Sequence, residues 1–150
     1  RLIIMVEGWI RDHLIGHAAR VGIFADLDMP GFRPNPFAFM RAVDLFVMSS
    51  DWEGHPTVMV EALACGAPVV STDCVSGPRE ILENGRYGRL TPPGDADALA
   101  RAMAEALEIP GNAAPRIARA YEFNVDASVD SYLAAAGWPP RETSLAGAAG

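Results

Sequence analysis

Hydrophobic and polar positions along the chain alternate between short apolar runs and longer segments with helical spacing. In the segment Ile10–Val21, for example, Leu14, Ala18 and Val21 recur at the spacing of one helix face. The apolar runs predict strands at Arg1–Val6, Leu27–Phe32, Val43–Ser49, Pro68–Thr72 and Tyr87–Thr91. The segments between and after them predict helices at Ile10–Val21, Phe37–Ala42, Pro56–Cys65, Pro78–Glu83, Ala96–Glu108, Ala113–Tyr121 and Val125–Ala136. This alternation is typical of right-handed βαβ crossovers, so we expect an α/β fold with a Rossmann-like parallel sheet covered by helices on both faces.

Local signals fix several of these boundaries. Gly66 suits the left-handed position that ends a helix, and Pro68 follows it. Pro78 suits a first helical position, and Asp95 is a candidate N-cap. The boundaries therefore rest on backbone chemistry as well as on periodicity.

Composition narrows the class of protein. The length of 150 residues favours one domain, which we place at residues 1–136, with a frayed tail over 137–150. A net charge of −7 argues against nucleic-acid binding. All 12 basic side chains are arginines, which excludes lysine Schiff-base chemistry. No stretch reaches the roughly 18 apolar residues of a membrane span.

The two cysteines and the first residue suggest the setting of the chain. Cys65 and Cys74 form no disulfide framework and no metal-binding pair, so we expect a reducing, cytoplasmic environment. The sequence opens on Arg1 inside a predicted strand, from which we expect a fragment that begins part way through a domain.

Glu61 is the most informative single residue, because it interrupts the apolar stretch from Thr57 to Cys65. A buried, unpaired carboxylate is costly, so Glu61 must reach solvent, a protein partner or a ligand. It lies about 7.5 Å along the helix from Pro56 and one turn after Thr57. A diphosphate at the helix start would bring a sugar diol to Glu61, with Glu53 approaching from the preceding loop.

These residues carry a resemblance to a known family. Glu53 and Glu61 form an E-x7-E arrangement, which is followed directly by agreement over 62–70. Agreement continues upstream through 30–32 and 42–47 and downstream through 77–81, 83–90 and 92–95. The ordered set resembles the donor-sugar site of retaining glycosyltransferases of the GT-B fold, family 4, over about two thirds of the chain.

The resemblance implies a site for each half of a nucleotide-diphosphate sugar, such as a UDP- or GDP-sugar. Glu61 would bind the ribose and Glu53 the transferred sugar. The phosphate and sugar would meet Gly54, His55, Pro56 and Thr57, and the base would meet Gly31, Phe32 and Arg33. Transfer would retain the anomeric configuration and need neither a cofactor nor a bound metal.

The resemblance also implies what the chain lacks. It would be the C-terminal, donor-binding half of a two-domain enzyme without its first strand-helix unit, and we expect it to transfer no sugar alone. A glycan or lipid-linked acceptor would bind the missing N-terminal domain. Such enzymes act in cell-envelope or exopolysaccharide assembly, at the inner face of the membrane in some cases.

Each assignment has a simpler alternative. Glu61 could face solvent on a half-exposed helix, and Glu53 could be an acid stabilised by the helix start. For His55 we favour a packing or capping role over a catalytic one. Cys65 is interpreted as a small residue that fills the core, and Arg79 as one partner of a surface ion pair. We interpret Asp51 and Asp73 as turn or cap residues and not as metal ligands.

Two other functions stay open. The chain could be a non-catalytic module that binds a sugar nucleotide or a partner. A nicotinamide-dependent oxidoreductase is disfavoured because no G-x-G-x-x-G follows a strand.

Overall fold

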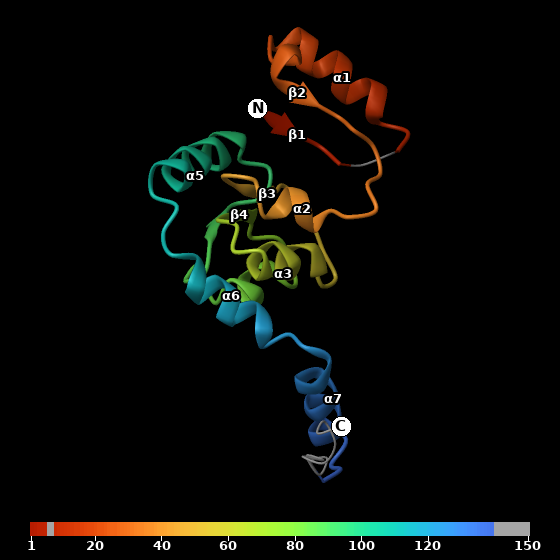
Figure 1. Cartoon of the computed structure of the whole chain (residues 1–150), viewed down its shortest axis with the longest axis vertical. Helices are drawn as coiled ribbons and strands as arrows, with labels where there is room; N and C mark the ends of the chain where they lie inside the picture. Colours follow the sequence, from red (N-terminus) through yellow and green to blue (C-terminus); the bar gives the residue numbers. More distant parts are fainter. Residues whose placement is uncertain (6–7, 140–150) are drawn as a thin grey trace, which may run out of the picture. The chain divides into compact units, whose positions relative to one another are not determined.

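A computed structural model describes residues 1–5 and 8–139 (Figure 1). Its contacts divide the chain into two compact units, Arg1–Phe39 and Met40–Gly150, which are described separately. None of the helices described is both long enough and apolar enough to cross a membrane.

The first unit contains one small parallel sheet and one helix. Strand β1 (Leu2–Ile3) pairs in parallel with β2 (Leu27–Asp28), and α1 (Arg11–Arg20) and the 3₁₀ turn η1 (Phe24–Asp26) lie between them in the chain. The prediction of a strand over 27–32 was wrong in its length. Pro30 has no N–H to donate, and Gly31 has a φ of +73°, so an extended ladder cannot continue through them. The predicted strand over 1–6 is also shorter, and Val6 lies outside the described residues.

The second unit follows the short helix α2 (Phe37–Met40) at the boundary. It is built from β3 (Phe46–Met48), α3 (Thr57–Ala64), β4 (Val69–Thr72), α4 (Pro78–Ile81), β5 (Arg89–Thr91), α5 (Ala96–Glu108), α6 (Ala113–Tyr121) and α7 (Val125–Ala135). The three strands run in parallel in the order β3-β4-β5. The predicted α/β class is confirmed.

Strand β4 lies at the centre of this sheet and all four of its residues are buried. Val69 packs in the main apolar cluster with Met59 and Leu63 of α3. Its neighbour Val70 is completely buried outside that cluster, and α5 packs on β4 and β5. Because neighbouring residues of a strand point to opposite faces, helices must cover both sides of β4.

Several predicted boundaries are confirmed by the backbone. Gly66 ends α3 with a φ of +81°, and Pro78 opens α4. The Asp95 side chain accepts a hydrogen bond from the N–H of Ala98 at 2.8 Å, as an N-cap does.

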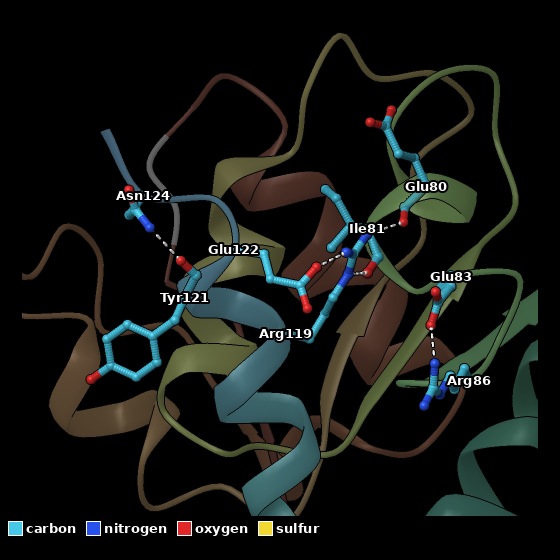
Figure 2. Close-up of polar contacts among 8 residues, drawn as sticks. All are labelled: Glu80, Ile81, Glu83, Arg86, Arg119, Tyr121, Glu122 and Asn124. Carbon is cyan, nitrogen blue, oxygen red and sulfur yellow. Dashed lines mark hydrogen bonds and ion pairs between the residues drawn. The ribbon is translucent and has the colours of Figure 1, made fainter. Parts of the chain in front are cut away.

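Two arginines of α6 donate hydrogen bonds to backbone carbonyls at the ends of α3 and α4. Arg116 donates to the carbonyl of Gly66 at 2.9 and 3.2 Å and to that of Pro110 at 2.8 Å. Burial lowers the pKa of this guanidinium. Arg119 donates to the carbonyls of Glu80 at 2.8 Å and Ile81 at 3.1 Å (Figure 2). Carbonyls at and just beyond a helix end lack a partner within the helix, and the two arginines supply donors to them, so α6 ties the ends of α3 and α4 to itself.

Candidate functional site

The candidate site lies at the carboxyl end of β3, in the loop that leads into α3. Thr72, the last residue of β4, donates through its hydroxyl to the carbonyl of Ser50 at 2.5 Å. Trp52 forms an isolated parallel bridge with Val75. The loop after β3 therefore lies against the loop after β4, at the edge where parallel α/β sheets bind ligands.

Glu53 is half-buried in this loop. Its Oε1 accepts a hydrogen bond from the Ser50 hydroxyl at 2.7 Å. The N-cap residue of α3 is Pro56, and no side chain caps that helix. Glu53 is therefore held by the loop and does not act as the cap of α3.

Glu61 lies on α3 one turn after Thr57, as the spacing predicts. It is half-buried, beside the completely buried Met59, Ala62 and Leu63. Among the residues described, none gives its carboxylate a hydrogen bond or an ion pair. The Glu61 carboxylate is thus positioned at the rim of the core, where solvent or a ligand must satisfy it.

The start of α3 offers a backbone N–H group without a partner among the described residues, and it carries no acidic residue in its first turn. The N–H of Thr57 bonds the carbonyl of His55 at 2.8 Å, and the N–H of Met59 bonds that of Pro56 at 2.9 Å. The N–H of Val58 has no such partner in the described part of the chain. No acidic residue occupies the first turn, so this end of the helix suits an anion.

His55 packs against another ring. Its ring centre lies 5.9 Å from that of Phe123, with the planes tilted by 45°. This contact supports the packing role predicted for His55.

Gly77 fixes the position of Pro56. It adopts a φ of +91°, and a Cβ built on it would lie 2.3 Å from Cδ of Pro56. Only glycine permits both the backbone conformation and the close approach. The loop after β4 thereby sets where α3 begins.

Beyond β4 the chain supplies further polar groups. Asp73 forms an ion pair with Arg79, which confirms the ion pair predicted for Arg79. Cys74 is buried, and burial, followed by the nearby charge of Glu53, raises the pKa of its thiol. Sequence reasoning missed the supporting roles of Ser50, Thr72 and Gly77, although a polar pair at the end of an apolar strand and a glycine before a proline were visible signals.

The three residues predicted to contact the base, Gly31, Phe32 and Arg33, belong to the first unit. Gly31 is buried with a positive φ, Phe32 is 78% exposed, and Arg33 is exposed. The predicted phosphate- and sugar-binding residues Glu53, His55, Pro56 and Thr57 thus lie together in the second unit. The three predicted base-binding residues form their own group in the first unit.

No group of three or more His, Cys, Asp or Glu side chains suited to a metal ion occurs within residues 1–5 and 8–139. Metal independence stays a prediction.

Two relatives that comparison with known proteins finds are named as glycosyltransferases. The chain is 35% identical over 133 residues to the lipopolysaccharide core biosynthesis glycosyltransferase LpsE of Rhizobium meliloti, covering 85% of this chain and 38% of that protein. It is 37% identical over 106 residues to an uncharacterized glycosyltransferase of Methanocaldococcus jannaschii, covering 62% of this chain and 26% of the relative. The chain therefore spans less than half the length of these relatives.

Solved structures show the same fold. The apo lipopolysaccharide outer core galactosyltransferase WaaB superposes with a TM-score of 0.83 at 22% identity, covering 91% of this chain and 40% of that one. Anabaena HepE in complex with UDP superposes with a TM-score of 0.71 at 29% identity, covering 83% of this chain and 35% of that one.

The sequence also matches the family described as "Glycosyl transferases group 1" over residues 2–123. Since the match covers most of the chain, the chain belongs to the group 1 glycosyl transferases.

Proposed function

We propose that this chain is the donor-binding half of a retaining glycosyltransferase of family 4. It binds a nucleotide-diphosphate sugar, and the complete enzyme transfers the sugar to a glycan or lipid-linked acceptor without a metal ion. The observation that carries this proposal is the half-buried Glu61 carboxylate without a protein partner, one helical turn beyond an uncapped helix start.

The two features suit the two parts of a nucleoside diphosphate. The start of α3 suits the diphosphate, because the N–H of Val58, which no described residue pairs, is a donor at the positive end of the helix dipole. Glu61 lies about 7.5 Å further along the axis and can accept hydrogen bonds from both hydroxyls of a ribose. The UDP in the HepE structure shows that a related protein binds this class of ligand.

Glu53 suits the transferred sugar. It precedes the start of α3 in the chain, whereas Glu61 follows it, and one of the Glu53 carboxylate oxygens already accepts from Ser50. The remaining acceptor capacity is available to a sugar hydroxyl.

In the reaction, the bond from the anomeric carbon to the leaving diphosphate breaks, and its electron pair stays on the diphosphate. A bond from the same carbon to the acceptor oxygen forms on the same face. The proton of the acceptor hydroxyl passes to the diphosphate oxygen. The names of relatives such as LpsE favour a role in lipopolysaccharide or exopolysaccharide assembly.

The first test is ligand binding by the isotopically labelled chain. Addition of UDP or GDP should shift the amide signals of Thr57, Val58 and Glu61, and NAD should shift none of them. The proposal would be contradicted if neither UDP nor GDP shifted these signals, or if NAD shifted them equally. A non-catalytic sugar-nucleotide module would pass this test but show no transfer in the complete enzyme.

A further inference from the structure

The loop after β4 and the helix α4 surround an open hollow of about 480 Å³ in the second unit. The polar groups of its lining come from four places in the chain. Asp73 ends the strand region, Ser76 lies in the loop, Arg79 and Glu80 belong to α4, and Asn84 lies in the following turn. None of these residues has a role in donor binding as proposed above.

The charges of this hollow favour a neutral ligand. It contains two carboxylates, Asp73 and Glu80, and one guanidinium, Arg79, which is already paired with Asp73. The net negative charge opposes a phosphate group. A polyhydroxyl ligand fits instead, because carboxylate and amide oxygens accept from hydroxyls while the amide N–H groups of Asn84 donate to them.

The Glu80 side chain is available for such a ligand. Its backbone carbonyl accepts from Arg119 at 2.8 Å, whereas its carboxylate points away from Arg119 (Figure 2). Arg119 also holds the carbonyl of Ile81, so α4 is fixed beneath the hollow. A binding group on a fixed backbone loses less conformational entropy when it binds.

An apolar rim lies beside these polar groups. Val75 lines the hollow and is 80% exposed, and Trp52, its partner in the isolated bridge, is 76% exposed. Exposed apolar side chains that lie next to one another, as these two residues do through their bridge, mark binding surfaces more often than single ones. Pyranose rings present C–H faces between their hydroxyls, so an aromatic and an aliphatic side chain beside polar groups match a sugar ring.

The hollow is close to Glu53. Glu53 lies in the loop after β3, and the hydrogen bond from Thr72 to Ser50 and the bridge from Trp52 to Val75 join this loop to the loop after β4 that lines the hollow. An acceptor sugar must lie next to the transferred sugar for a bond to form between them.

We propose that this hollow binds a neutral sugar unit of the acceptor, beside the sugar contacted by Glu53. This inference rests on the proposed function and adds an acceptor subsite to the donor-binding half.

The test is an amide-shift titration of the labelled chain with the methyl glycosides of glucose, galactose, mannose and N-acetylglucosamine. At least one should shift the signals of Val75, Ser76 and Glu80, with a Kd on the order of millimolar for so open a site. The variants Glu80→Ala and Asn84→Gly should each weaken that binding about tenfold. Glycine suits position 84, where φ is +55°, so this variant keeps the backbone.

A control variant is Glu108→Ala, which removes an exposed carboxylate at the end of α5 and should leave glycoside binding unchanged. A separate titration with UDP and GDP distinguishes the two proposals. If the nucleotides bind and no glycoside shifts the hollow, only the acceptor subsite is wrong. If neither binds, the proposed function fails as well. If Glu80→Ala and Asn84→Gly weaken nucleotide binding as much as glycoside binding, the hollow belongs to the donor site and the proposal is overturned.

Discussion

Replacing Glu61 by glutamine keeps the size of the side chain and removes its negative charge. If the carboxylate accepts hydrogen bonds from a ribose diol, the variant loses charge-assisted bonds worth about 1.5–3 kcal/mol. The affinity for the matching nucleoside diphosphate should therefore fall roughly tenfold to a hundredfold.

The same substitution should leave stability almost unchanged. No hydrogen bond or ion pair from another described residue reaches the Glu61 carboxylate, and the side chain is only half-buried. Glutamine at this position therefore breaks no contact within the protein. A loss of binding with an unchanged melting temperature is the expected signature of a ligand-binding role.

Calorimetric titration with UDP and GDP, together with a melting curve, measures both quantities in the complete enzyme. Glu53→Gln is the informative comparison. It should lower the rate of transfer more than nucleotide affinity, because the proposed contact is to the sugar that moves. Glu108→Gln, on the exposed end of α5, should change neither quantity.

One result would refute this reasoning. If Glu61→Gln kept full nucleotide affinity but lowered the melting temperature strongly, Glu61 would be a structural residue and would not bind the ligand.

Three further predictions concern the supports of the site. Gly77→Ala should destabilise the chain more than Gly94→Ala. Both glycines have a positive φ, but only a Cβ at position 77 would lie 2.3 Å from an atom of Pro56. Equal melting temperatures of the two variants would contradict this close contact. Arg116→Met should leave the carbonyls of Gly66 and Pro110 without their donor and lower the free energy of unfolding, measured in urea, by about 2–3 kcal/mol. Arg101→Met, on the exposed face of α5, should change it little. The raised pKa of Cys74 means that the folded state holds the thiol proton more tightly than the unfolded state. The contribution to stability is therefore complete below the ordinary thiol pKa and is lost as the pH rises through the raised value. Iodoacetamide at pH 8 should alkylate this thiol much more slowly in the native chain than in urea, and equal rates would show that it is accessible.

The sequence by itself predicted most local elements of the second unit and membership of the glycosyltransferases, which the family match over residues 2–123 confirms. Periodicity and end signals such as Gly66, Pro78 and Asp95 depend on neighbours within a few residues, which is why they predicted most of the helices of the second unit closely. The position of Glu61 one turn beyond Thr57 follows from helix geometry alone.

Only the tertiary structure decided what surrounds these elements. Arg116 meets a carbonyl 50 positions away in sequence, and Arg119 meets carbonyls 38 and 39 positions away. The contact of Gly77 with Pro56 and the hollow beside α4 likewise join separate segments. No short-range pattern encodes such contacts, because they depend on how the strands order in the sheet and how α6 packs against α3. The early end of β2 has the opposite cause, since Pro30 and Gly31 are local features whose effect on the backbone outweighed the apolar pattern.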